Sequence, residues 1–240
     1  MRIAVVSDIH GNLTAFEAVL KDLRDSAPDL VLHGGDLAEG GARPVEVIDS
    51  IRSLGWRGVV GNTDEVLWAS ERLEEISTRS PKLRSLMTCI GDIVATTSEW
   101  LGADRIAWLQ TLPQVKHSSL LALVHAAPND LWRAPLATAS DAELESVYSV
   151  LNAPIAVYGH IHTPFVRHCG GITVANSGSV GLPYDGDTRA SYLLVDGPQV
   201  NIQRVEYDID AECSFLLQSG LPHATWVSEL LRGGRYTPPL

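Results

Sequence analysis

Short apolar segments in this sequence end repeatedly at side chains that can bind a metal ion. The segments cover residues 2–7, 30–33, 57–60, 119–124 and 155–158, and the side chains that follow them are Asp8, His10, Asp36, Asn62, His125, His160 and His162. Carboxylate, imidazole and amide groups together suit Mn, Fe, Zn, Ni or Co better than Ca or a thiolate-preferring ion. Since open α/β sheets bind ligands beyond the carboxyl ends of their strands, we expect these seven side chains to converge on one rim.

Two pairs of these residues have the same spacing. Asp8 and His10 lie two positions apart, as do His160 and His162. In an extended segment such side chains project to the same side, about 6.6 Å apart at 3.3 Å per residue. Each pair could then face one cavity and serve two ions roughly 3.5–4 Å apart. The alternative is ordinary turn chemistry, in which Asp, Asn and His at strand ends bond the local backbone.

Helical patterns separate the first three apolar segments. Asn12 is a candidate N-cap for a segment whose apolar residues recur at helical spacing. Pro44 suits the first turn of a second helix, and Gly55 suits its end. Alternating strands and helices predict a parallel sheet covered by helices.

The rest of the chain mixes helices and strands. Residues 64–112 have a mainly helical pattern with breaks expected at Pro81 and Gly91, and this segment is a candidate cap over the site. Ser140 and Glu143 form a capping box at the start of a further helix. Strand patterns follow at residues 164–168, 171–175, 190–195 and 199–206. We expect a single domain over residues 1–240, with a small helical appendage at about 207–240.

Composition limits the partners. The 240-residue chain is 45% hydrophobic and carries a formal charge of −11, so a large buried core is expected and binding to long nucleic acid is disfavoured. A small phosphorylated substrate remains compatible, because bound cations can reverse the local field. The absence of a signal-peptide pattern, of an apolar run of roughly 20 residues and of paired cysteines predicts a cytoplasmic protein without a membrane partner. The oligomeric state is not visible in the sequence.

The ordered motifs resemble a known family. Asp-X-His at 8–10, Gly-Asp at 35–36, Gly-Asn at 61–62, His125 and Gly-His-X-His at 159–162 occur in the order found in the calcineurin-like metallophosphoesterase superfamily. The resemblance covers roughly residues 1–206. It is closer to the branch with small bacterial phosphodiesterases and diadenosine-polyphosphate hydrolases, since residues 176–187 resemble that branch's closing segment.

This resemblance implies an α/β fold, namely a four-layer α-β-β-α sandwich of two mixed sheets flanked by helices, with a site for two divalent transition-metal ions. It implies one ion on Asp8, His10, Asp36 and His162, and a second on Asp36, Asn62, His125 and His160. Asp36 would bridge the two ions, and Mn is the first choice of metal. The expected reaction is hydrolysis of a phosphodiester or nucleotide anhydride by metal-bound hydroxide, with Asp36, Asn62 and His125 as the catalytic residues.

Thr63 departs from the family pattern. Many members carry a proton-donating His there, and threonine is a poor general acid whose presence would cost about 10²–10⁴-fold in rate with poor leaving groups. Aryl phosphodiesters and phosphoanhydrides have good leaving groups and would suffer least, and His223 or Tyr184 could replace the donor. Further candidate substrate contacts are Thr63 itself, Arg43 and Arg133, and Trp132 could stack on a base.

Two other functions stay open from the sequence. A protein or small-molecule phosphomonoesterase would use the same ligands, but it would lack the usual acid at Thr63. A metal-bearing scaffold without catalysis is the second alternative, because the superfamily includes a trafficking-coat subunit with degraded ligands. Every ligand that the family pattern expects is present here, which argues against such decay.

Overall fold

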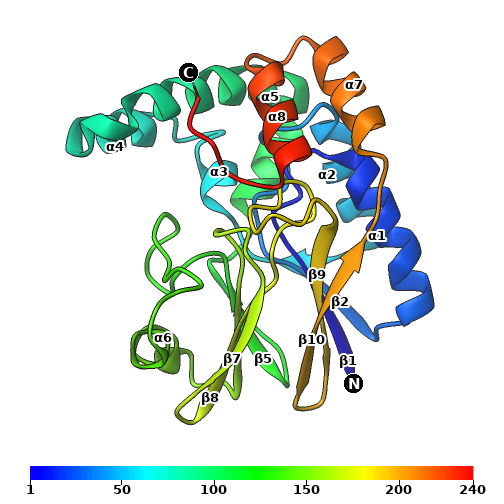
Figure 1. Ribbon diagram of the computed structural model, residues 1–240, viewed down its shortest axis with the longest axis vertical. Helices are drawn as coiled ribbons and strands as arrows, with labels where there is room; N and C mark the ends of the chain where they lie inside the picture. The colour runs from blue at the N-terminus through cyan, green and yellow to red at the C-terminus, as the bar shows by residue number, and fades with distance from the viewer. Residues whose placement is uncertain (240) are drawn as a thin grey trace.

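In the computed structural model, which describes residues 1–239, two five-stranded sheets pack face to face (Figure 1). The first sheet has the order β10-β9-β1-β2-β3 and the second β4-β5-β6-β8-β7. Their bounds are Arg2–Val6, Leu30–His33, Arg57–Gly58, Val115–His117, Leu121–Val124, Ile155–Tyr158, Phe165–Cys169, Ile172–Asn176, Ala190–Asp196 and Gln199–Val205 for β1 to β10. Helices α1 and α2 cover the outer face of the first sheet and α6 that of the second, so the predicted four-layer sandwich is confirmed.

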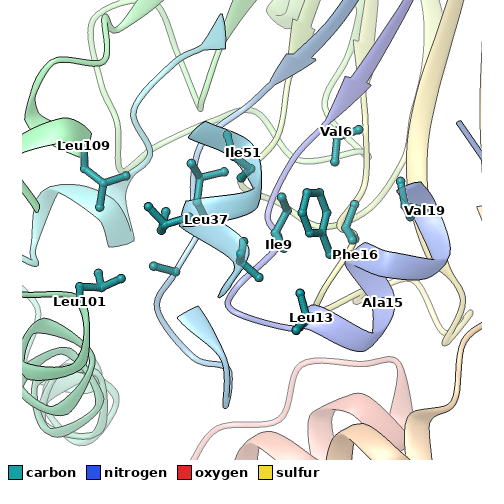
Figure 2. Close-up of a cluster of buried hydrophobic side chains, with 14 of the residues drawn as sticks. Val6, Ile9, Leu13, Ala15, Phe16, Val19, Leu37, Ile51, Leu101 and Leu109 are labelled. Atoms are coloured by element: carbon teal, nitrogen blue, oxygen red, sulfur yellow. The ribbon is translucent and has the colours of Figure 1, made fainter. Parts of the chain in front are cut away.

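Strand β1 shows why this arrangement follows from the sequence. It pairs in parallel with β2 and antiparallel with β9, and its residues are almost all apolar. Ile3 and Val5 point into the core between the sheets, whereas Val6 packs against the helical layer. Figure 2 shows Val6 beside Phe16 and Val19 of α1. A strand that is buried on both faces is expected to be continuously apolar.

The helices begin and end close to the predicted signals. Their bounds are Leu13–Ser26, Pro44–Leu54, Asn62–Glu65, Glu71–Arg79, Arg84–Gln110, Asp141–Tyr148, Ile209–Ser219 and Ala224–Gly233 for α1 to α8. The Asn12 side chain accepts a hydrogen bond from the Ala15 N–H at 2.9 Å, and Gly55 ends α2 in the left-handed region with φ 67°. The Ser140 hydroxyl caps α6 in the same way as Asn12 caps α1.

Three details of the prediction were wrong. Gly91 lies inside α5 and does not interrupt it, because a helix tolerates glycine at a modest cost. The backbone leaves helical geometry at Gly102 instead, where φ is 67° and ψ is 170°. The third strand ends at Gly58 rather than at residue 60, and β4, at the edge of the second sheet, has no clear sequence signal.

The helices at the top of Figure 1 share one apolar cluster. Ile93 of α5 packs with Leu216 of α7, Leu230 of α8 and Leu182 of the loop before β9. His223, at the start of α8, also bonds Asp92 of α5 at 2.8 Å. The helices of the 64–112 segment and of the C-terminal segment therefore lie against each other and against a loop that enters the site. Within residues 1–239, no helix is long and apolar enough to cross a lipid bilayer.

Candidate metal centre

The ends of β1, β2, β5 and β6 bring the predicted ligands together. Ligand atoms of Asp8, His10, Asp36 and His162 lie within 4.8 Å of one another, and the same holds for Asp36, His125 and His160. Asn62 joins the second group, since its Oδ1 lies 2.8 Å from both His125 Nε2 and His160 Nδ1. All of these side chains except His160 are buried. The two groups share Asp36.

The backbone at these ligands differs from the predicted extended geometry. Five of them occupy the left-handed region, with φ values of 51° to 65°: Asp8, His10, Asp36, His160 and His162. A non-glycine residue in this region costs of order 1–3 kcal/mol, and such strain concentrates at functional sites. The backbone turns sharply at the end of each of these strands, and this turn directs the paired side chains toward a common point.

Each imidazole is held by a backbone carbonyl on its outer side. Nδ1 of His10 lies 2.7 Å from the Glu39 carbonyl oxygen, and Nδ1 of His162 lies 2.5 Å from that of Leu182. His125 makes the same contact with the Gly34 carbonyl at 2.8 Å. A ring nitrogen that faces a carbonyl oxygen must carry the proton, so the inward nitrogen of a neutral ring has a lone pair. This arrangement is common behind metal-binding histidines.

The inward-facing atoms fit a cation. His10 Nε2 and His162 Nε2 are 3.2 Å apart, and His125 Nε2 lies 3.4 Å from the Asp36 carboxylate. Two nitrogen lone pairs at this distance repel each other unless a proton or a metal ion lies between them. The donor set of carboxylate, imidazole and amide oxygen therefore suits divalent transition metals.

The pKa values reflect the same concentration of charge. Burial acts to lower the pKa of His10, but the carboxylates of Glu39 and Asp36 outweigh it and raise that pKa to about 9. Burial acts in the same direction on His125, but the Asp36 carboxylate outweighs it and raises this pKa to about 9 as well. Burial, assisted by the charge of His125, lowers the pKa of His160 to about 4. Burial would raise the pKa of Asp36, yet His125 and His10 hold it below its usual range. Protons therefore occupy positions that a metal ion would take over.

Asp64 connects two of the ligand loops. Its carboxylate is fully buried and accepts hydrogen bonds from the backbone N–H groups of Asp36 at 2.9 Å, Leu37 at 2.9 Å and Gly61 at 3.0 Å. The bond to Gly61 caps the start of α3, and the other two fix the loop that carries Asp36. Burial and the charge of Asp36 raise the pKa of Asp64 to about 6.

Glycines let these loops approach closely. A Cβ atom on Gly61 would lie 2.1 Å from Asp36 Oδ1, and one on Gly159 would lie 2.3 Å from Asp8 Oδ2. Real Cβ atoms do not come this close to other atoms, so each position excludes any side chain. Gly61 and Gly159 are therefore required by contact between loops rather than by turn geometry alone.

Comparisons with known proteins identify the family of this chain. The family model of the calcineurin-like phosphoesterase superfamily domain matches residues 1–198. The chain belongs to this superfamily. It is 30% identical to an uncharacterized protein of Methanocaldococcus jannaschii over 97% of this chain and 98% of that one. A metallophosphoesterase of Sphaerobacter thermophilus superposes with a TM-score of 0.80 at 27% identity, over 98% of this chain and all of that one.

A relative that matches a smaller part of the chain carries a more specific name. The chain is 31% identical to the symmetrical bis(5'-nucleosyl)-tetraphosphatase of Methylococcus capsulatus over 61% of this chain and 50% of that protein. The chain thus spans about half the length of this relative. Together with the family, these matches make the protein a hydrolase that acts on phosphoric esters.

The predicted substrate contacts differ in their surroundings. The Thr63 N–H donates to Asp36 Oδ1 at 2.9 Å, and the buried Thr63 hydroxyl has no partner among residues 1–239. Arg133 is exposed and follows Trp132, whose carbonyl lies 3.1 Å from His160 Nε2. Arg43 is directed to Glu212, 2.9 Å away, so its guanidinium is engaged by the protein. Their roles toward a substrate stay predictions.

The Trp132 indole donates to Glu65 at 3.0 Å and packs against the helical core, which leaves less of the ring available for base stacking. Of the two alternative proton donors, His223 is bonded to Asp92 on the outer face of α5. Tyr184, in contrast, stacks on His162 with ring centroids 4.5 Å apart.

Three further features of the described chain are a buried histidine, the cysteines and a serine beside the first ligand loop. His33 is buried, and neither of its ring nitrogens has a hydrogen-bond partner in the described chain. Burial lowers the pKa of His33 to about 3. The three cysteines are free and buried. Ser179 holds the first ligand loop, since its hydroxyl donates to the Asp8 carbonyl at 2.7 Å. Backbone-mediated contacts of this kind leave no sequence motif.

Proposed function

We propose that this protein is a dinuclear metal-dependent phosphohydrolase that cleaves a phosphodiester or a nucleotide phosphoanhydride. The observation that carries the proposal is the pair of ligand groups that share Asp36. One ion would be held by Asp8, His10, Asp36 and His162, and the other by Asp36, Asn62, His125 and His160. Mn is the metal that we would test first, and the donor set suits Fe, Zn, Ni or Co as well.

A bound pair of divalent cations would lower the pKa of a water molecule and stabilise the charge that develops on the phosphoryl oxygens. The protein's own part is to orient this chemistry. Carbonyl groups fix the imidazole rings of His10, His125 and His162, and Asp64 fixes the backbone of Asp36. Preorganised groups of this kind cost no reorganisation during the reaction.

Thr63 supports the choice of substrate class. No imidazole occupies this position to protonate a leaving group, so substrates with good leaving groups are favoured. Phosphoanhydrides meet this condition because their leaving group is itself a phosphate, and so do aryl phosphodiesters. The name of the Methylococcus capsulatus relative favours a nucleotide anhydride. Its match covers only part of that protein, which is why the substrate is a proposal.

The test is a substrate panel with the Mn-loaded protein. We expect faster turnover of dinucleoside polyphosphates and bis-aryl phosphodiesters than of alkyl monophosphates, and about two metal ions per chain. His125→Ala should abolish turnover and leave the far-ultraviolet circular dichroism unchanged. Faster hydrolysis of alkyl monophosphates or phosphopeptides would replace this proposal with a phosphomonoesterase. An empty site under Mn-replete conditions would favour a non-catalytic scaffold.

A further inference from the structure

A row of four aromatic rings leads outward from the metal centre. His10 and His162 have ring centroids 4.9 Å apart, and Tyr184 stacks on His162 at 4.5 Å with an interplanar angle of 20°. Tyr236 then meets Tyr184 edge to face at 5.7 Å. The inner rings are buried or partly buried, whereas 44% of Tyr236 is exposed. The row therefore ends in an open aromatic surface two ring contacts from His162.

The C-terminal tail is tied to this place. The Gly186 N–H donates to the Gly234 carbonyl at 2.8 Å, and the Trp226 indole donates to the Thr237 carbonyl at 2.8 Å. In Figure 1 the red tail leaves α8 and runs back past the yellow loop that precedes β9. The first bond holds the segment before Tyr236 against the loop that carries Tyr184, and the second holds the segment after Tyr236 against α8.

We propose that Tyr236 is a stacking surface for an aromatic ring of the substrate, a nucleobase or an aryl group joined to the reacting phosphate by a short linker. The proposal rests on the proposed function and names the organic part of its substrate. Stacking on an aromatic side chain accepts any base, because every base has a π face. Tyr184 positions Tyr236 through its edge contact, and its opposite contact with His162 links this surface to the metal centre.

The test compares two ligands that differ only in the base. Adenosine monophosphate and ribose 5-phosphate are titrated into the Mn-loaded full chain by calorimetry. We expect adenosine monophosphate to bind more tightly, and Tyr236→Leu to weaken it about tenfold while leaving ribose 5-phosphate unchanged. Tyr236→Phe, which keeps the ring, should bind like the original protein. Leu217→Ala is the control, since Leu217 of α7 is a comparably exposed apolar residue at 58%.

Two results would overturn the proposal. Equal affinity of the unsubstituted protein for both ligands would mean that no base is recognised, and this comparison needs no variant to fold. Equal weakening of both ligands by Tyr236→Leu would mean that the tail only supports the phosphate site. Neither readout depends on turnover, so failure of the proposed hydrolase activity would be seen separately in the substrate panel.

Discussion

At the scale of single residues, the site depends on groups that never touch a metal ion. Asp64 receives three backbone N–H groups, two of them from the loop of Asp36. The Asp64 carboxylate thus fixes the backbone of the Asp36 loop. In the same way, the carbonyls of Glu39, Gly34 and Leu182 fix the orientation of the imidazole rings. Such supporting contacts orient metal ligands, and losing one typically costs about 10–100-fold in metal affinity.

Asp64→Asn should therefore weaken metal binding about 10–100-fold. The amide places an N–H₂ group against backbone donors, and the resulting unsatisfied groups should lower the free energy of unfolding by about 1–3 kcal/mol. Calorimetric titration with Mn and urea unfolding measure the two effects. Asp25→Asn on the exposed side of α1 is the control and should stay within about 0.5 kcal/mol. Unchanged Mn affinity in Asp64→Asn would contradict the positioning role.

The raised pKa values predict how stability changes with pH. His10 and His125 have an ordinary pKa of 6.5 in the unfolded chain and about 9 in the folded, metal-free chain. Between these values the folded form holds more protons, so the free energy of unfolding should fall as pH rises from about 6.5 to 9. Bound Mn should remove this decline, because it replaces those protons. Urea unfolding from pH 6.5 to 9, once with a chelator and once with Mn, measures this pH dependence. The same slope of the free energy of unfolding against pH in both conditions would refute the prediction.

At the scale of elements, the loops after β1, β2, β3 and β6 approach so closely that glycine is needed between them. Gly61 precedes α3 with φ −103°, which any residue could adopt, so only contact with Asp36 excludes a side chain there. Gly91, by comparison, lies within α5, where an added Cβ would meet only Leu73 at an ordinary 3.7 Å.

These two glycines form a matched pair of substitutions. Gly61→Ala should cost about 1–3 kcal/mol of stability through overpacking and should reduce bound metal. Gly91→Ala should stabilise the protein by about 0.5–1 kcal/mol, since alanine is the better helix residue. Urea unfolding measures the change in stability of both variants, and metal analysis measures their bound metal. If Gly61→Ala had the same free energy of unfolding and the same bound metal as the original protein, the loops would not need to be this close.

At the scale of the whole molecule, the C-terminal helices are tied to the first helical layer by an ion pair. Glu212 of α7 is fully buried and accepts hydrogen bonds from Arg43 at 2.9 Å and the Thr14 hydroxyl at 2.6 Å. Arg43 also lies over Phe215, 4.2 Å from its ring centroid. One buried oxygen of Glu212 and Nε of Arg43 have no partner in residues 1–239, so the pair is incompletely satisfied.

Arg43→Met should lower the free energy of unfolding by about 3–5 kcal/mol, because it leaves the Glu212 carboxylate buried without its cation. The double variant Arg43→Met/Glu212→Leu should recover most of this loss, since an apolar pair needs no compensation there. A double-mutant cycle by urea unfolding measures the coupling. Additive losses would disprove the pairing, and a raised KM in both variants would support the substrate contact predicted for Arg43.

Much of this protein can be predicted from its sequence because the relevant signals are local. Apolar runs indicate most of the strands, Asn12 and Ser140 mark helix starts, and polar side chains at strand ends indicate the candidate ligands. The tertiary structure alone decided the left-handed turns at the ligands, the backbone contacts of Asp64 and the row that ends at Tyr236. Backbone N–H and carbonyl groups are the same at every position, and residues far apart in the chain meet only after folding, so neither kind of contact leaves a motif to read.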